Sequence, residues 1–142
     1  MDKSPDTEQL TIWGSVDVWQ SAHIKKIRLP AKLTSLRQKL YRKAKMEPKF
    51  RFYVLYDRIF RRDVLSSAYR IARANKGKAG VDGVTFDDIE TGPGGIEGFL
   101  DGIEESLKSK TYRPMAVRRA WIPKPDGRKR PLGIPTIRDR VI

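Results

Sequence analysis

A short segment near the end of the chain, Pro125-Asp126-Gly127, constrains the fold more than any other feature. These residues suit a three-residue hairpin loop, because proline fixes φ, aspartate tolerates the middle position and glycine adopts a left-handed conformation. Such a loop pairs Lys124 with Arg128. The sequence therefore predicts two short antiparallel strands within residues 112–142, and prolines in both strands mark them as exposed or edge strands.

The register of this hairpin decides which side chains share a face, because side chains alternate along a strand. One face then carries four basic and four apolar or small residues: Arg118, Ala120, Ile122, Lys124, Arg128, Arg130, Leu132 and Ile134. Four cations on one face are a candidate clamp for a triphosphate or a phosphodiester backbone, although charged edges also serve simply to prevent aggregation. A two-residue loop would shift the register and move Arg130 to the face of Trp121.

The charge of the whole chain favours a polyanionic partner. Its 142 residues include 30 Lys and Arg against 17 Asp and Glu, a net charge of +13. Small domains usually carry a net charge of magnitude about 2–8, so nucleic acid is favoured over a merely soluble surface. An anionic membrane surface is a weaker alternative, because no basic stretch alternates with a large apolar face.

Several classes of site and location are excluded by composition. The chain has no cysteine, so it has no disulfide framework and no thiolate metal site. Its single histidine, His23, is read as an incidental surface residue. Residues 1–10 lack the apolar core of a signal peptide, and no apolar run reaches membrane-spanning length. These features predict a soluble cytoplasmic protein without membrane contact.

The first part of the chain is read as a basic extension. Residues 1–30 carry only weak periodicity, whereas leucines at helical spacing predict a helix over 31–46. Its candidate nucleic-acid contacts are the basic residues Arg37, Arg42 and Lys43. A single-signed charge run is often only a solvated helix face, but it also costs self-repulsion unless an anion lies nearby. The aromatic run 50–56 fits either a strand or the buried start of a helix.

Two further helices are expected. Asp63 should cap a helix over 64–75 that ends before Gly77. Its expected apolar stripe consists of Val64, Ala68, Ile71 and Ala72. The second helix, over 96–110, has acidic residues near its start and lysines near its end, as the helix dipole favours. Its expected apolar face, which we expect to lack a partner, consists of Ile96, Phe99, Leu100, Ile103 and Leu107.

Glycines predict two loops between these helices. The segment Asn75–Thr85 contains three glycines, which favour a flexible loop that lets another backbone approach closely. Residues 86–95 are expected to form a second loop, with its breaker at residues 92–95. A glycine loop by itself is weak evidence of function and is usually a connector.

The end of the sequence resembles the start of a helix. Thr136 and Asp139 have the spacing of a capping box, and the helix should bury Ile137 and Val141. A helix this short is not stable alone, so we expect the natural polypeptide to continue.

Several motifs together resemble the fingers region of bacterial group II intron reverse transcriptases. They are YRP from Tyr112, VRR from Val117, IPKPDG from Ile122, RPLGIPT from Arg130, and the upstream ANKGKAGVDGVT from Ala74. The resemblance covers about residues 45–142 and leaves 1–44 as a partly helical, basic N-terminal extension.

The resemblance implies an α+β fold, namely the fingers and part of the palm of a right-hand polymerase. It implies RNA-directed DNA synthesis, often with a maturase role, and as partners an RNA template, a DNA primer, intron RNA and a dNTP. The residues it assigns to the dNTP triphosphate are Arg118, Lys124 and Arg130. The candidate template and primer contacts are Asn75, Lys76, Gly77, Lys78 and Gly80, with Arg128 as a further nucleic-acid contact.

The resemblance also implies that the catalytic machinery lies elsewhere in the enzyme. In the family, palm aspartates hold a pair of Mg²⁺ ions, and these motifs are absent from this sequence. The pairs Asp87-Asp88 and Glu104-Glu105 lack the required strand-turn context, so this segment should bind substrates without polymerising them. Two alternatives stay open: a freestanding non-catalytic RNA-binding module from a truncated retroelement, and a structural ribonucleoprotein component.

Overall fold

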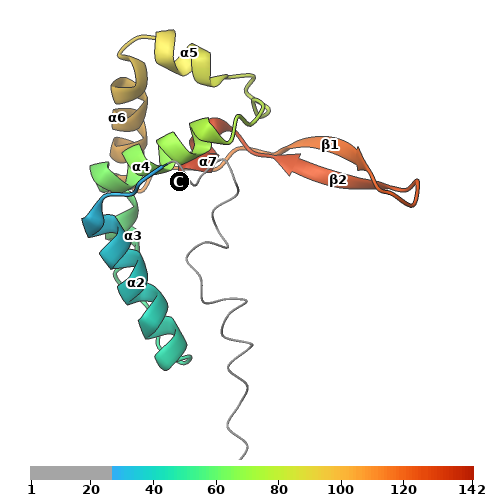
Figure 1. Cartoon of the computed structure of the whole chain (residues 1–142). Coiled ribbons are helices and arrows are strands. Elements are labelled where there is room, and N and C mark those ends of the chain that lie inside the picture. Colours follow the sequence, from blue (N-terminus) through green and yellow to red (C-terminus); the bar gives the residue numbers. More distant parts are fainter. Residues whose placement is uncertain (1–26) are drawn as a thin grey trace, which may run out of the picture.

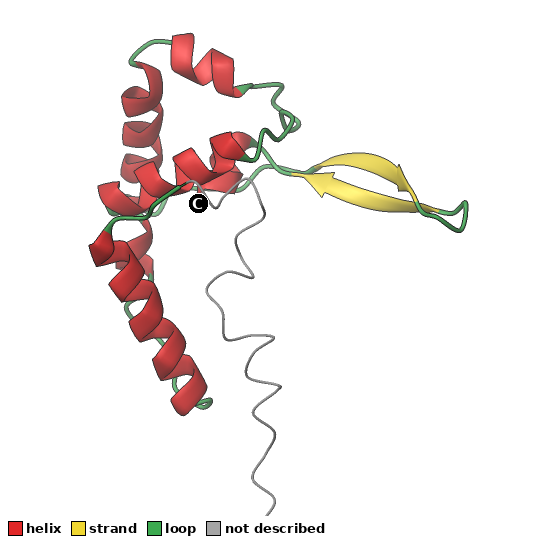
Figure 2. Cartoon of the chain, in the orientation of Figure 1, coloured by secondary structure: helices red, strands yellow, loops and turns green. Residues whose placement is uncertain are grey.

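The computed structural model describes residues 27–142 and has six helices and one two-stranded antiparallel sheet within that range (Figure 2). The elements in chain order are α2 (Ala31–Met46), α3 (Tyr56–Ile59), α4 (Arg62–Ala74), α5 (Phe86–Thr91), α6 (Gly95–Lys108), β1 (Arg118–Pro123), β2 (Lys129–Ile134) and α7 (Ile137–Val141). The expected α+β class is confirmed. The interpretation of residues 1–26, including His23, lies outside the described residues.

The hydrophobic core lies where α4, α5, α6 and α7 meet. Its buried members are Leu65, Tyr69, Ala72, Phe86, Ile89, Leu100, Ile103, Leu107, Ile137 and Val141. The ring of Tyr69 meets Phe86 and Phe99 edge to face, with centroids 5.8 and 5.9 Å apart. Elements from the middle and the end of the sequence therefore share one core, which places the base of the hairpin against the helices (Figure 1).

The helix α4 differs from expectation in its cap and in its buried face. Arg61, and not Asp63, occupies the N-cap position, and the Asp63 carboxylate pairs with Arg61. Leu65 and Tyr69 are buried, whereas the expected stripe residue Val64 is only half-buried. The stripe is displaced because the partners of α4 lie on two sides, in α6 and in α7. The left-handed residue after the helix is Lys76 (φ 48°), not Gly77.

The expected loop over 86–95 is wrong in its first half, which forms α5. Thr85 and Asp88 make a reciprocal capping box: the Thr85 hydroxyl accepts from the Asp88 N–H, and the Asp88 carboxylate accepts from the Thr85 N–H. Burial of Phe86 and Ile89 holds this short helix on the core. The predicted breaker is confirmed, because Gly94, the N-cap of α6, and Gly95, its first residue, both have positive φ.

The helix α6 confirms the amphipathic pattern and contradicts the expectation that its apolar face lacks a partner. Leu100, Ile103 and Leu107 are buried against the rest of the core. Arg62 of α4 forms ion pairs with Asp101 and Glu97 on the outer side. The face is covered because α4 and α5 both pack on it.

The helix α2 has the expected position and projects from the helical body (Figure 1). Leu33 is its only buried residue, and its bounds match the helix expected over 31–46. The aromatic run that follows is neither a strand nor the buried start of a helix. Residues 50–55 form an irregular segment in which Phe50 and Tyr53 are exposed and Phe52 is half-buried.

Candidate nucleotide and nucleic-acid interface

The hairpin has the register that its loop chemistry predicts. Ile122 pairs with Arg130 and Ala120 with Leu132, while the Lys124 N–H donates to the Arg128 carbonyl at 2.7 Å. Gly127 has a φ of +78°, as the third loop position requires. The two-residue loop is thereby excluded, and Arg118, Lys124, Arg128 and Arg130 share one face of the ribbon.

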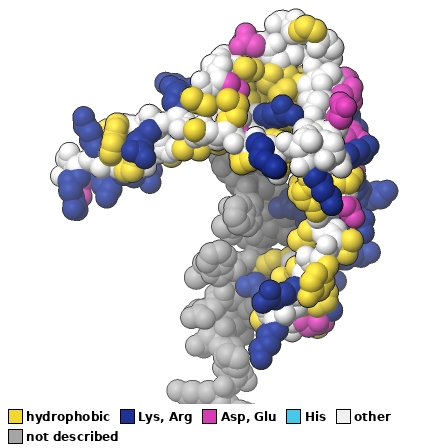
Figure 3. Space-filling view, turned by 180° about the vertical axis from the view of Figure 1, so that it is seen from behind, with side chains coloured by type: hydrophobic (Ala, Val, Ile, Leu, Met, Phe, Trp, Pro, Cys, Tyr) yellow, Lys and Arg dark blue, Asp and Glu magenta, His cyan; other side chains and the backbone are white. Residues whose placement is uncertain are grey.

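Basic side chains dominate the surface of the hairpin, which extends away from the helices (Figure 3). Arg128 is partly neutralised, because its Nε and Nη2 donate to the Asp126 carboxylate at 3.0 and 2.8 Å. Hydrogen bonding to Arg128 lowers the pKa of Asp126. Within residues 27–142, Lys124 and Arg130 have no acidic partner. These two cations are therefore available to an external anion.

The three residues assigned to the triphosphate are spread along the ribbon. Lys124 and Arg130 are diagonal neighbours near the tip, a relation that places Cα atoms about 7–8 Å apart. Arg118 lies six residues before Lys124, which is about 20 Å along an extended strand. The hairpin therefore brings Lys124 and Arg130 together and leaves Arg118 at its base.

At that base, Arg118 contacts the glycine loop. Its Nε donates to the carbonyl of Ala79 at 3.2 Å, which ties β1 to the segment Asn75–Thr85. The expected close approach of a backbone also occurs in this loop. A Cβ on Gly80 would lie 2.6 Å from the backbone N and Cα of Thr136, so only glycine fits there. The expectation of a loop that admits another backbone is confirmed, and the backbone it admits is the start of α7.

The remaining predicted loop contacts have different surroundings. Gly77 makes room for the guanidinium of Arg140, which would lie 1.9 Å from a Cβ at that position. Arg140 also donates to the carbonyls of Lys78 and Pro135. The side chains of Asn75, Lys76 and Lys78 are exposed. Arg140, to which sequence reasoning assigned no role, therefore fixes the loop by its contacts with Gly77 and Lys78. The polar side chains of the loop remain exposed to solvent.

A second hydrogen-bond network fixes the segment that precedes β1. The carboxylate of Asp139 accepts hydrogen bonds from the Tyr112 hydroxyl, the Thr136 hydroxyl (2.8 Å) and the Met115 N–H (3.1 Å). Partial burial raises the pKa of Asp139, but the hydrogen bonds outweigh it, and the pKa lies below its usual value. Burial and the bond to Asp139 raise the pKa of Tyr112 to about 12. We call these four residues the Asp139 latch.

The predicted contacts on α2 form a separate surface. Arg37 and Arg42 are exposed and have no ion pair within the described residues. Lys43 pairs with Glu47 at 2.6 Å and lies over the ring of Phe50. In Figure 1, α2 and the hairpin leave the helical body in different directions. The structure therefore does not bring the α2 cations and the hairpin cations to one site.

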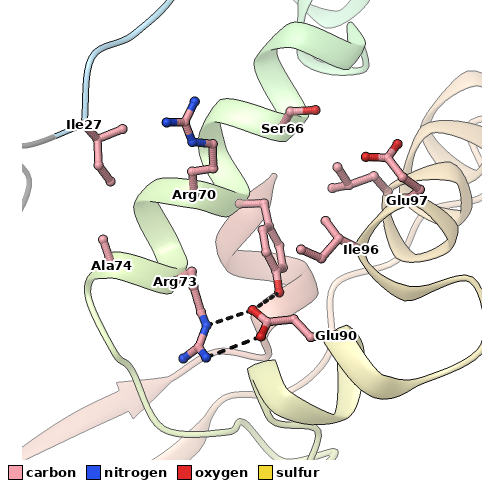
Figure 4. Close-up of a pocket in the computed structure, with 10 residues that line it drawn as sticks. Ile27, Ser66, Arg70, Arg73, Ala74, Glu90, Ile96 and Glu97 are labelled. Atoms are coloured by element: carbon pink, nitrogen blue, oxygen red, sulfur yellow. Dashed lines mark hydrogen bonds and ion pairs between the residues drawn. The ribbon is translucent and has the colours of Figure 1, made fainter.

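A hollow of about 480 Å³ lies between α4, α5 and α6 (Figure 4). On its polar side, Glu90 accepts from Arg73 Nε at 2.8 Å and from the Tyr69 hydroxyl at 3.2 Å. Arg70 also lines the hollow, is exposed, and has no hydrogen bond or ion pair within the described residues. Burial is the main cause that raises the pKa of Tyr69 to about 12, followed by the negative charge of Glu90. The bonds of Glu90 to Arg73 and Tyr69 join α5 to α4, so they stabilise the packing of these two helices.

The described residues do not fit a site for two Mg²⁺ ions. Within residues 27–142, no group of three or more His, Cys, Asp or Glu side chains could hold a metal ion. The carboxylates of Glu97, Asp101 and Glu104 converge instead on the guanidinium of Arg62. Asp88 is engaged in the α5 cap and Asp87 pairs with Arg73 at 3.0 Å. Among these same residues, none of the helices is both long enough and apolar enough to cross a membrane.

The sequence of the chain is similar to those of known proteins. No family model matches the chain. Protein YkfC of Escherichia coli (strain K12) is 34% identical over 112 residues, which are 78% of this chain and 29% of YkfC. The group II intron-encoded protein LtrA of Lactococcus lactis subsp. cremoris is 41% identical over 92 residues, 64% of this chain and 15% of LtrA.

The chain is homologous to group II intron-encoded proteins. The resemblance to group II intron reverse transcriptases and maturases, drawn from sequence motifs, is thereby confirmed. The chain spans less than a third of the length of these relatives. Sequence reasoning singled out the hairpin cations as candidate contacts, whereas it assigned no role to Arg140 or Tyr112. The signal for both was present, since YRP and the residues after RPLGIPT belong to the motifs of the resemblance.

Proposed function

We propose that this chain is the part of an RNA-directed DNA polymerase, encoded by a group II intron, that holds the incoming dNTP and contacts template and primer. A maturase role in binding the intron RNA belongs to the same proposal. The observation that carries it is the register of the hairpin, which places Arg118, Lys124 and Arg130 on one face. Homology to LtrA supports the family, and the net charge of +13 supports polyanionic partners.

In this proposal, Lys124 and Arg130 bind the triphosphate. They are neighbours near the tip of an exposed ribbon and have no acidic partner within the described residues. Cations placed where negative charge develops on the transferred phosphates lower the barrier to phosphoryl transfer. In this proposal Arg118 contacts the nucleotide from the base of the ribbon, about 20 Å along the strand from Lys124, where its Nε donates to the Ala79 carbonyl of the glycine loop.

The nucleic acid follows two surfaces in this proposal. Template and primer lie against the glycine loop, at the exposed side chains of Asn75, Lys76 and Lys78, with Arg128 at the hairpin tip. The intron RNA contacts the cations of α2. The Mg²⁺ ions would supply Lewis-acid activation of the reacting oxygens in the complete enzyme. In this proposal their ligands lie in other parts of the complete enzyme, since the described residues contain no group of side chains that could hold a metal ion.

Binding of a fluorescent dNTP analogue to the 142-residue chain tests the nucleotide site. Lys124→Ala should weaken binding about 10- to 100-fold, since a hydrogen bond to a charged group contributes about 1.5–3 kcal/mol. Arg119→Ala is the matched control, because Arg119 is a neighbouring exposed cation on the opposite face of the same strand. Equal losses of dNTP affinity in both variants would show that the hairpin attracts anions only non-specifically, through its overall positive charge.

Steady-state kinetics test the same role in the complete enzyme. Lys124→Ala should raise the KM for dNTP or lower kcat, while Arg119→Ala should leave both near the wild-type values. Unchanged kinetics in Lys124→Ala would remove the assigned role. If the chain binds RNA tightly and no dNTP at all, the freestanding RNA-binding module becomes the better description.

A further inference from the structure

A basic and aromatic surface at the far end of α2 is not used by the nucleotide site. The segment after α2 turns at Glu47, whose carbonyl accepts from the Phe50 N–H at 2.9 Å, and runs back beside the helix (Figure 1). The Lys43 Nζ lies 4.3 Å from the centre of the Phe50 ring, and Phe50 meets Phe52 edge to face with centroids 5.1 Å apart. We call residues 41–55 the aromatic arm.

The apolar side chains of the aromatic arm are unusually open to solvent. Tyr53 is 86% exposed, Val54 65% and Phe50 43%. Large exposed apolar groups that gather on one surface mark an interaction site. In Figure 3, hydrophobic and basic side chains alternate over this arm. A partner that fits this surface must offer both flat apolar groups, for the exposed rings, and negative charges, for the basic side chains.

The charges decide which class of partner fits. The basic residues of the arm are Arg42, Lys43, Lys45, Lys49 and Arg51. Its single acidic residue is Glu47, which Lys43 pairs at 2.6 Å. An apolar protein surface would bury these cations without a counter-charge, which is costly. Nucleic acid supplies phosphates for the cations and base faces for the rings.

The aromatic rings of the arm indicate whether the nucleic acid it binds is paired or single-stranded. Aromatic side chains stack on bases only where those bases are unpaired, as in single strands, loops and bulges. The residue that follows the arm, Tyr56 at the start of α3, is anchored to the helical body. The Tyr56 hydroxyl donates to the Leu107 carbonyl at 2.8 Å, and the Tyr56 ring meets Phe60 at 6.1 Å. Stacking groups on an anchored segment lose less freedom on binding than groups on a free chain.

We propose that the aromatic arm is a binding site for unpaired RNA. Tyr53 and Phe50 stack on successive bases, and the surrounding lysines and arginines contact the phosphates between them. The proposal deepens the RNA-binding part of the proposed function and rests on it. It adds a preference for single strands, which cations alone would not create.

Fluorescence anisotropy with a labelled single-stranded RNA of about 10 nucleotides, and with a duplex of equal length, tests this preference in the 142-residue chain. Tyr53→Ala should weaken single-strand binding about tenfold, the loss of one stacked base, and leave duplex binding unchanged. Tyr53→Phe is the matched control that keeps the ring, and it should bind like the wild type. Tyr53→Leu keeps the apolar volume without the ring and should resemble the alanine variant.

The outcomes separate the two proposals. If the wild type binds neither RNA, the RNA-binding part of the proposed function fails and the arm proposal fails with it. If the wild type binds RNA but Tyr53→Ala and Tyr53→Leu bind the single strand equally well, the arm alone is overturned. Folding is not at stake, because Tyr53 is almost fully exposed, and circular dichroism of each variant verifies this.

Discussion

At the scale of single residues, glycine in the upstream loop is required for packing. Gly80 is buried where the loop crosses the start of α7, and a Cβ there would meet only backbone atoms, at 2.6 to 2.9 Å. Backbone cannot rotate away as a long side chain can. The contact joins the loop to the hairpin through Thr136, so one small residue sets the position of two candidate binding elements.

Gly80→Ala should therefore destabilise the chain by about 1–3 kcal/mol, the usual cost of overpacking. The matched control is Gly102→Ala in α6, where nothing lies within 4 Å of the new Cβ. That change should stabilise by about 0.5–1 kcal/mol, since alanine is the better helix former. Urea unfolding followed by circular dichroism measures both. A neutral Gly80→Ala would mean that the loop moves aside easily.

Asp139 is the second residue on which the geometry of the binding elements depends, because it joins Tyr112, Met115 and Thr136. Asp139→Asn should lower the free energy of unfolding by about 1–3 kcal/mol at neutral pH, as expected for losing hydrogen bonds to a charged group. The pKa of Asp139 is depressed in the folded chain. Its contribution is thus present above the unfolded pKa of about 3.9 and lost as the pH falls through the lower folded value.

Unfolding curves from pH 7 to acid check this pH dependence. The stability difference between the wild type and Asp139→Asn should be full above pH ~4 and should shrink below it, as the carboxylate of the folded wild type is protonated. Asp126→Asn serves as a control. Bonding to Arg128 lowers the pKa of Asp126 as well, but this pair is exposed to solvent at the hairpin tip, so its pH-dependent contribution should be much smaller. A stability difference between wild type and Asp139→Asn that stays constant with pH would show that the negative charge of Asp139 does not stabilise the fold.

At the scale of elements, the hairpin is a ribbon attached at one end. Its residues are mostly exposed along both strands, and the contacts that hold it lie at the base, through Arg118 and the Asp139 latch. The helices α4 and α6, in contrast, contribute fully buried residues to the core. Elements with few buried contacts open at low free energy, while core elements open only when the chain unfolds.

Amide hydrogen exchange should therefore be fast in the outer hairpin and slow in α4 and α6. The Lys124 N–H, although bonded to Arg128 at 2.7 Å, should exchange with little protection in the free chain. If the tip binds a triphosphate, adding dNTP should slow exchange there, and Arg119→Ala should leave this effect intact. Protection of the free hairpin equal to that of α6 would contradict the one-end attachment.

At the scale of the whole molecule, one core supports three separate surfaces: the hairpin, the glycine loop and the aromatic arm. The core draws its residues from α4, α5, α6 and α7, so it closes only when the end of the chain packs on the middle. Ile137 and Val141 of the short helix α7 are both buried in it. The core therefore fixes the glycine loop and the base of the hairpin relative to each other.

Leu100→Ala should test this shared core, because Leu100 is fully buried in α6. The expected loss is about 2–5 kcal/mol, the usual range for removing a buried leucine side chain. Ile96→Ala, in the same helix but 36% exposed, should cost clearly less. Thermal unfolding monitored by circular dichroism compares them. Similar small losses in both variants would indicate that the core is loosely packed.

Sequence alone determined the features that local chemistry controls. The Pro-Asp-Gly loop set the hairpin register, the Thr136-Asp139 spacing set the start of α7, and the amphipathic period predicted α6. Each of these depends on residues only a few positions apart. The capping box of α5 is equally local, but the glycines after it led to the wrong expectation of a loop.

Only the tertiary structure decided what is buried, what is paired and what is left open. It showed that Tyr69 faces the core, that Gly80 admits α7, and that the rings after α2 lie in solvent. It also separated Arg118 from the pair Lys124 and Arg130 along the ribbon. The physical reason is that burial and side-chain pairing depend on which faces of elements far apart in the sequence pack together. The periodicity of one segment does not specify which other segment packs on it.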